Sequence, residues 1–306
     1  MRLIARIRTR MVVALDLRRD AADQGRVFCE ATGPADNPTH PVHLGSMTSM
    51  RLHLFEWEDQ VWFPASLRNA MTSYLVAAYG VTPLPKLWAE RLAALMKPNQ
   101  PSHIVDLGSG SGGPIPRIVK ELGKSGFMVR VTLTDLFPHP NTPLFAQDEQ
   151  NSISYWPEPV DAAKVPPSLR GIRTMFASFH HLPPQRAREV LRDAFEHLQT
   201  ICIFEGTSRA PAAIASMLLV PLLVLLLTPK VRPVSWVQIA FTYLVPILPL
   251  VILWDGIVSQ LRTYSVKELG ELTRGLESPD YRWEIGLMEI PRMPAGLPYI
   301  IGRGIQ

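Results

Sequence analysis

The stretch Ile104-Val105-Asp106-Leu107-Gly108-Ser109-Gly110-Ser111-Gly112-Gly113 decides the fold of this chain. An apolar strand enters a turn whose glycines let the backbone approach a ligand closely, and a helix follows at once. Gly108, Gly110 and Gly113 also match the dinucleotide fingerprint, but the carboxylate of Asp106 would repel a pyrophosphate. The stretch therefore predicts a site for a cationic or zwitterionic ligand at a strand-to-helix turn.

Strands and helices alternate on both sides of this turn. Short apolar runs fit buried strands, and the segments between them carry apolar residues at helical spacing. This alternation is typical of an α/β fold with a doubly wound, mostly parallel sheet that helices cover on both faces. The expected strands are 103–106, 127–134, 153–155, 172–177, 200–204, 282–290 and 297–303, and the expected helices are 62–79, 87–97, 114–122, 184–198 and 265 to about 276.

Composition excludes several classes of protein. The chain has 306 residues, of which 47% are hydrophobic and 19% are charged, and a disordered chain would be far more polar. Its two cysteines, Cys29 and Cys202, exclude a disulfide scaffold and a thiolate metal cluster and favour a reducing compartment. The net charge of +4 comes without a basic stripe, so we expect no nucleic-acid partner. Residues 1–46 are rich in arginine and predict a non-catalytic stretch, either a disordered extension or an over-long gene model with the working start near Met47 or Met50.

Over roughly residues 60–208, the chain resembles the class I S-adenosylmethionine-dependent methyltransferases in five motifs and in their order. The resemblance implies a Rossmann-like, seven-stranded sheet that ends in an antiparallel strand pair, and S-adenosyl-L-methionine as the cofactor. The motifs are IVDLGSGSGG (104–113), VTLTD (131–135), PVDA (159–162), TMFASFHHL (174–182) and ICIFEG (201–206).

The same resemblance assigns cofactor-binding residues by position. Asp135 would hold the ribose hydroxyls, although an ordinary turn acid would also fit there. Asp161 would lie near the adenine amine, and it fits the role of a turn acid without a ligand equally well. Ser178 and Phe179 would flank the cofactor. The methionine part would face Asp106, Gly108, Ser109, Gly110 and Gly112.

His180 and His181 follow the fourth expected strand, at the carboxyl edge where open sheets of this class bind ligands. A histidine there is a candidate general base, because its unperturbed pKa is near neutrality. The alternative without a catalytic role is that one histidine caps the next helix or binds backbone, and the other is solvated. No HxxxH or HExxH spacing occurs, so we expect no metal. Asp255 is a third catalytic candidate, although an Asp255–Arg262 ion pair without chemistry is equally consistent with the sequence.

The stretch Phe55 to Pro64 mixes three carboxylates with four bulky aromatic residues. In the resembling family the region before the glycine motif often covers the substrate, and paired acids there could hold a cation or accept a proton. The favoured interpretation is simpler. We expect the start of an amphipathic helix with solvated acids.

Two apolar arms, residues 210–229 and 233–254, carry no charged residue and flank a short basic turn with Lys230 and Arg232. Each arm has about 20 residues, enough at about 1.5 Å per residue to cross a hydrocarbon core of about 30 Å. We expect a membrane hairpin that either spans the bilayer or enters one leaflet, with kinks at Pro221, Pro246 and Pro249. The soluble alternative is a pair of buried helices or an oligomer interface.

Together these features predict a methyltransferase that transfers a methyl group to a heteroatom of a small lipophilic substrate, with the catalytic domain on the cytoplasmic side of a lipid bilayer. An NAD(P)-dependent membrane oxidoreductase and a non-catalytic cofactor-binding subunit stay open as alternatives, and the oligomeric state is unknown. The expected segments are an extension (1–46), a helical lid (47–98), the cofactor-binding core (99–209), the apolar hairpin (210–254) and the completion of the core (255–306).

Overall fold

A computed structural model describes residues 50–138, 152–232, 234–291 and 295–305. The expectation for residues 1–46 lies outside these residues. Residues 49–306 form one compact unit, to which the following description applies.

A seven-stranded sheet is the centre of the fold, in the order β3-β2-β1-β4-β5-β7-β6. The first five strands pair in parallel, while β7 runs antiparallel to both β5 and β6. The expected fold class and the closing antiparallel pair are confirmed. The strands are β1 (Ser102–Leu107), β2 (Val129–Thr134), β3 (Ile153–Tyr155), β4 (Ile172–Phe176), β5 (Ile201–Phe204), β6 (Tyr281–Met288) and β7 (Leu297–Gly304).

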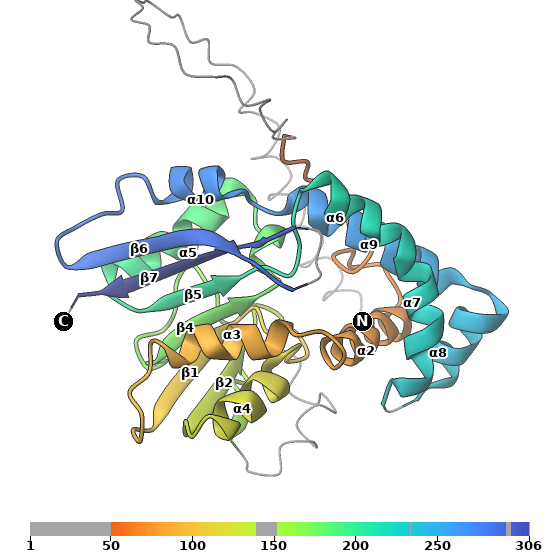
Figure 1. Ribbon diagram of the computed structural model, residues 1–306, viewed down its shortest axis with the longest axis horizontal. Helices are drawn as coiled ribbons and strands as arrows, with labels where there is room; N and C mark the ends of the chain where they lie inside the picture. The colour runs from red at the N-terminus through yellow and green to blue at the C-terminus, as the bar shows by residue number, and fades with distance from the viewer. Residues whose placement is uncertain (1–49, 139–151, 233, 292–294, 306) are drawn as a thin grey trace, which may run out of the picture. The chain divides into compact units, whose positions relative to one another are not determined.

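Helices cover both faces of the sheet, and the strands supply an apolar side chain to each face in turn (Figure 1). On β1, Ile104 belongs to the core under α3 (Leu84–Ala93) and α4 (Ile115–Lys124), whereas Val105 belongs to the opposite core. That second core lies under α5 (Pro184–Glu196) and α10 (Val266–Thr273). The sheet is therefore buried on both sides, as near-continuous apolar strands require.

The order of the strands indicates at which edge of the sheet a ligand would bind. The chain passes from β1 to β2 on one side and later returns to β4 on the other side of β1. Open α/β sheets bind ligands at the carboxyl ends of the strands at such a switch point, because the two connecting loops diverge there. In this chain the glycine turn follows β1, and the paired histidines follow β4.

The first apolar arm forms one nearly continuous helical segment, Pro211–Lys230, through α6 (Pro211–Ser216) and α7 (Val220–Leu227). The second arm is not one helix. The α8 segment (Trp236–Ile239) continues as a π-helix to Leu244, and the chain then bends by 88° into α9 (Ile247–Arg262).

Prolines explain the break only in part. Pro246 lies at the bend, where a residue without an N–H group cannot continue the helical hydrogen bonds. Pro249 lies in the first turn of α9, where a missing N–H costs little, and the bend falls at Pro246 instead. Pro221 follows a 3₁₀ turn, Met217–Leu219, inside the first arm, and the kink expected there stays a prediction. Helix α9 also runs through the expected segment boundary at 254/255 and ends eight residues later.

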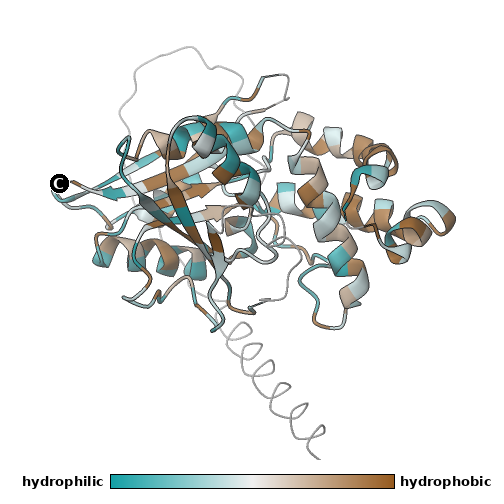
Figure 2. Cartoon of the chain, turned by 90° about the horizontal axis from the view of Figure 1, so that it is seen from below, coloured by the Kyte–Doolittle hydropathy of each residue, from teal (hydrophilic) through white to brown (hydrophobic). Residues whose placement is uncertain are grey.

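The inserted helices pack against α2 (Ala65–Tyr79) in a third apolar cluster that includes Met71, Val224 and Leu248. Their other sides are exposed, and Figure 2 shows hydrophobic residues gathered over these helices. Only 28% of the most apolar window of Pro211–Lys230 is buried. By length and composition alone, this helix could cross a membrane, and the bent pair after it would pass the same test if counted as one span. The exposed residues include Leu218, Leu219, Leu222, Leu226, Trp236, Tyr243, Leu244 and Leu250.

Candidate active site

The glycine turn after β1 has an open, backbone-lined surface. Gly108, Gly110 and Gly112 adopt φ angles of 64°, 52° and 90°, a region that residues with a Cβ atom rarely enter. A Cβ atom built on Gly110 would meet no atom within 4 Å, so the turn leaves room for a ligand at that residue. The shape predicted from the sequence is therefore present.

Asp106 lies at the base of this turn and is buried. The hydroxyl of Thr174 on β4 donates to its Oδ1 at 2.7 Å. Burial raises the pKa of Asp106 to about 7, despite this hydrogen bond. A cationic ligand group beside the carboxylate would favour its charged form. The side chain is thus suited to a ligand that brings a positive charge.

Ser109 and Asp135 connect the turn to β2. The Ser109 hydroxyl donates to the carbonyl of Asp106 at 2.8 Å and accepts from the N–H of Thr134 at 3.2 Å. Asp135 accepts from the N–H of Gly110 at 2.8 Å through Oδ2. Because each carboxylate oxygen can accept more than one hydrogen bond, Asp135 keeps capacity for a ligand hydroxyl.

Ser178 and Phe179 differ in whether their side chains could contact a ligand. The Ser178 hydroxyl is buried and has no hydrogen-bond partner among the described residues, and it lies 3.9 Å from a Cβ atom built on Gly108. The Phe179 ring is fully buried against Tyr264, with ring centroids 5.5 Å apart. The Phe179 side chain therefore belongs to the core, and only its backbone could face a ligand.

Asp161 is part of an ion pair. Its two carboxylate oxygens accept from Arg186 Nη2 at 2.7 and 2.8 Å, and Oδ1 also accepts from the N–H of Ala163. Burial opposes the charge of Asp161, but these donors hold its pKa below the usual range. The half-exposed carboxylate is occupied, and its assignment to the adenine stays a prediction.

His180 is held by Glu205, the residue that follows β5. Glu205 Oε2 lies 2.7 Å from His180 Nδ1, and Glu205 Oε1 accepts the backbone N–H of His180 at 2.8 Å. Both side chains are about 4% exposed. A carboxylate only accepts hydrogen bonds, so Nδ1 is assigned as the donor, and in the neutral imidazole the lone pair then lies on Nε2. The bland alternative of a helix-capping histidine does not describe His180.

His181 has a different environment. Its Nδ1 lies 3.1 Å from Asp59 Oδ1 and 3.1 Å from Glu56 Oε2. Burial would lower the pKa of His181, but the hydrogen bond to Asp59 and the charges of Glu56 and Asp59 raise it to about 9. His181 is therefore protonated near neutral pH and cannot accept a proton from a substrate.

Residues 51–63, here called the strap, lie across these histidines. The expectation of a helix start with solvated acids is wrong, because α2 begins only at Ala65 and Glu56 is 1% exposed. Arg262 Nη1 lies 3.2 Å from Glu56 Oε2 and 2.6 Å from Asp59 Oδ2. The buried guanidinium compensates the charge of these acids.

Asp255 also binds the strap. Its carboxylate accepts the backbone N–H groups of Trp57 at 2.8 Å and Glu58 at 3.1 Å. Burial raises the pKa of Asp255 to about 7, against the effect of these two donors. The expected Asp255–Arg262 pair is wrong, since Arg262 binds Glu56 and Asp59 instead. The carboxylate of Asp255 is engaged in positioning the strap.

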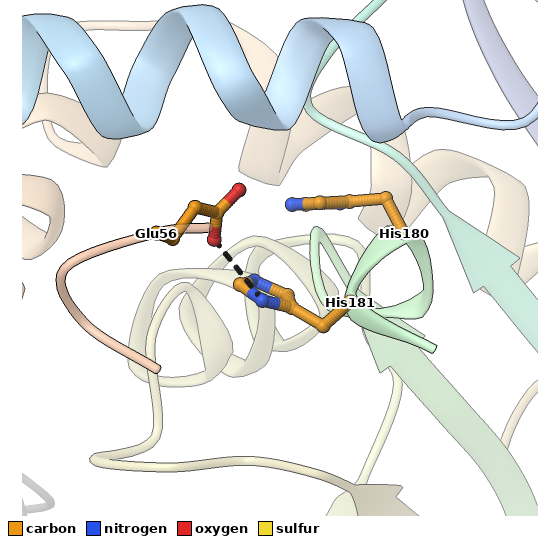
Figure 3. Close-up of side chains that lie close together, drawn as sticks. All are labelled: Glu56, His180 and His181. Carbon is orange, nitrogen blue, oxygen red and sulfur yellow. Dashed lines mark ion pairs between the residues drawn. The ribbon is translucent and has the colours of Figure 1, made fainter. Parts of the chain in front are cut away.

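Glu56, His180 and His181 lie close enough to hold a metal ion in principle (Figure 3). One potential ligand atom from each lies within 4.8 Å of the others. However, Arg262 Nη1 lies 3.4 Å from His181 Nδ1, and a guanidinium stays charged when buried. A second cation would meet this charge and a protonated imidazole. The donor set therefore suits Arg262 better than a metal ion, and the expectation of no metal stays a prediction.

Sequence reasoning did not assign three residues of this site: Glu56, Glu205 and Arg262. Glu205 had a usable signal, because it ends a parallel strand just as Asp135 does and so had to lie at the same edge. The pairing of Glu56 with Arg262 had no signal, since 206 positions separate the two residues in the chain.

No protein-family model matches the chain, and no curated protein matches it. Among solved structures, the plantazolicin methyltransferase BpumL in complex with SAH has 13% identity and a TM-score of 0.45, over 81% of this chain and 93% of that chain. A SAM dependent methyltransferase from Aquifex aeolicus has 13% identity and a TM-score of 0.40, over 73% and 93%. The mitomycin 7-O-methyltransferase MmcR has 12% identity and a TM-score of 0.43, over 72% and 54%. The cofactor and the reaction are therefore argued from the residues of this chain.

Proposed function

We propose that the chain is a methyltransferase that uses S-adenosyl-L-methionine to methylate a heteroatom of a small lipophilic acceptor at a membrane surface. One observation carries this proposal. The open glycine turn lies at the same sheet edge as the His180–Glu205 pair, and beside Gly108 is the Ser178 hydroxyl, which has no partner among the described residues. A ligand site and an oriented base thus meet where an α/β sheet performs chemistry.

The residues of the turn fit this cofactor. Asp106 suits a zwitterionic amino acid group, and Asp135 has spare acceptor capacity for ribose hydroxyls. Within the part of the chain that the structure describes, the buried Ser178 hydroxyl has no hydrogen-bond partner, and a bound molecule would supply one. When bound, S-adenosyl-L-methionine supplies an electrophilic methyl group on a positively charged sulfur atom.

His180 would receive the proton that the acceptor heteroatom loses. In the neutral imidazole the Nε2 lone pair would take this proton, because Glu205 accepts the hydrogen bond from Nδ1. The same carboxylate stabilises the imidazolium that forms, as a carboxylate does for the base of a catalytic triad. His181, already protonated, and Asp255, bound to strap amides, take supporting roles in this scheme.

The membrane part of the proposal rests on the exposed apolar insertion. Lys230 and Arg232 at its turn are exposed and suit anionic headgroups, and Trp236 and Tyr243 suit the interface. The segment Trp236–Leu244, before the 88° bend, reaches only about 13 Å at about 1.5 Å per residue. A helix this short cannot cross about 30 Å of hydrocarbon, so the second arm does not span as one straight helix. We propose that the insertion lies in one leaflet, on the cytoplasmic side.

Two measurements test the proposal separately. Isothermal titration compares S-adenosylhomocysteine with NAD, and binding of NAD alone would refute the cofactor. Incubation with methyl-labelled S-adenosyl-L-methionine and a total lipid extract then identifies the acceptor. If the cofactor binds but no labelled product appears, the catalytic part fails and a cofactor-binding subunit is left.

Vesicle binding tests the membrane part. Leu218, Leu222 and Leu226 are exposed on one face of the first arm, at four-residue spacing. We expect their joint replacement by serine to abolish sedimentation with vesicles that contain anionic lipid. The matched control replaces Met128 and Leu198, equally exposed on the sheet domain, and should bind vesicles like the wild type. Equal binding of all three proteins would refute the membrane contact.

A further inference from the structure

The strap is bound by side chains in the second half of α9. Asp255, Ser259 and Arg262 follow one another at spacings of four and three residues, so they share one face of the helix. Asp255 holds strap amides, Ser259 donates to Glu56 Oε1 at 2.9 Å, and Arg262 donates to the carbonyl of Leu54. Every one of these contacts is polar.

Few apolar side chains of the strap are buried. Phe55, Val61 and Trp62 are 47%, 95% and 68% exposed, so they contribute little apolar burial. In the strap, only Glu56 and Phe63 are fully buried. Segments with few buried apolar contacts open at a lower free energy than the core does. Phe63 and Trp57 pack in the apolar cluster beneath the insertion and tie down one end of the strap. Opening of residues 51–60 therefore breaks hydrogen bonds and ion pairs and also releases the Trp57 ring.

The strap also closes the route to the base. His180 is 3% exposed, and the carboxylate of Glu56 faces it from the strap (Figure 3). An acceptor that gives a proton to Nε2 must approach within hydrogen-bond distance of that atom. Because Glu56 occupies the space in front of the two histidines, the acceptor can reach His180 only after the strap moves.

The outer side of the strap is continuous with the apolar surface of the insertion. An open hollow of about 300 Å³ lies between them, lined by Phe55, Trp57, Leu250, Val251 and Trp254. The ring of Phe55 lies 5.3 Å from that of Trp254, whose indole N–H donates to the carbonyl of Phe55 at 3.0 Å. Helix α9 thus carries exposed apolar residues in its first half and the polar contacts of the strap in its second.

We propose that the strap is a lid, locked by Arg262 over His180, that opens when the insertion and the outer side of the strap enter a lipid surface. The lipid surface would cover Phe55 and Trp62, which are exposed in the locked state. It would also compensate for the polar contacts that opening breaks. The proposal rests on the membrane contact of the proposed function and adds how that contact admits the acceptor.

Hydrogen exchange of the full-length protein tests the lid directly. The N–H groups of Leu52, Trp57 and Glu58 all donate to α9, so exchange of a peptide over 51–60 reports strap opening. We expect Arg262→Gln to speed this exchange about tenfold or more, since hydrogen bonds to charged groups contribute about 1.5–3 kcal/mol each. The control is Arg91→Gln on α3, which removes contacts with Glu284 on β6 and Tyr299 on β7 and should leave the strap unchanged.

The second arm adds phosphatidylcholine vesicles, with and without phosphatidylglycerol, to the wild type. We expect faster exchange in 51–60 and unchanged exchange in β1 and β4. Slow strap exchange in Arg262→Gln would overturn the lock, and unchanged strap exchange on vesicles would overturn the lipid trigger. If Arg262→Gln also speeds exchange in β1, the milder Asp255→Asn variant is measured instead. Slow exchange of residues 51–60 in that variant would likewise overturn the lock. Methyl transfer is measured in a separate assay. A failure of the lid can therefore be distinguished from a failure of the proposed methyltransferase activity.

Discussion

Ser178 gives a prediction in which protein stability and ligand affinity move in opposite directions. Its hydroxyl is buried without a partner among the described residues, and an unmade hydrogen bond of this kind costs about 1–3 kcal/mol. Ser178→Ala removes the unsatisfied oxygen and leaves a void of one atom. We therefore expect the ligand-free protein to gain about 1 kcal/mol, which raises Tm by roughly 2–4 °C.

The same substitution should weaken the cofactor. If a bound molecule supplies the missing partner, its loss costs about 0.5–1.5 kcal/mol, or about 2- to 13-fold in Kd. Differential scanning fluorimetry measures Tm, and isothermal titration with S-adenosylhomocysteine measures Kd. The control is Ser73→Ala on α2, whose exposed hydroxyl already donates to Asn69, and which should change neither quantity. A lower Tm, or an unchanged Kd, would refute the assignment of Ser178 to the ligand site.

Three further changes test other parts of the site. Glu205→Gln should lower kcat about 10- to 150-fold, because a charge-assisted hydrogen bond of about 1.5–3 kcal/mol orients His180. The affinity for S-adenosylhomocysteine should stay unchanged, and an equal loss of affinity would contradict this role. The raised pKa of His181 stabilises the fold fully below about 6.5 and loses this effect as pH rises through about 9, so Tm of the wild type should fall towards that of His181→Gln across this range. Zinc and a chelator should each leave Tm unchanged, because Arg262 already supplies the positive charge beside Glu56 and His181; a zinc-dependent rise in Tm would show that the donor set binds metal.

The elements of the sheet could be predicted because their signals are local. Strand β3 is found at Ile153–Tyr155, as expected, and the other strand limits differ by at most two residues. Glycine spacing, apolar runs and acids after strands each act within a few residues of the chain. Topology then adds the rest, since the carboxyl ends of parallel strands share one edge. Asp106, Asp135 and His180 could therefore be placed together before their contacts were known.

The strap could not be predicted, because its structure depends on distant residues. Glu56 lies in a segment that reads as an amphipathic helix, yet its partners Ser259 and Arg262 come more than 200 residues later. Local patterning cannot show that a buried guanidinium will neutralise an acid. The expected solvated acids were wrong for this reason.

Helix α9 shows why charge does not mark the end of a structural element. Its sequence changes from apolar to charged at Trp254-Asp255, and this change predicts a boundary between an insertion and the core. Charge reports the surroundings of a side chain, whereas backbone hydrogen bonds decide whether a helix continues. The bonds continue to Arg262, so one rigid helix passes from the exposed apolar surface at Leu250 to the strap. A single element with two environments can couple them, and this continuity is the physical basis for a lid that responds to a lipid surface.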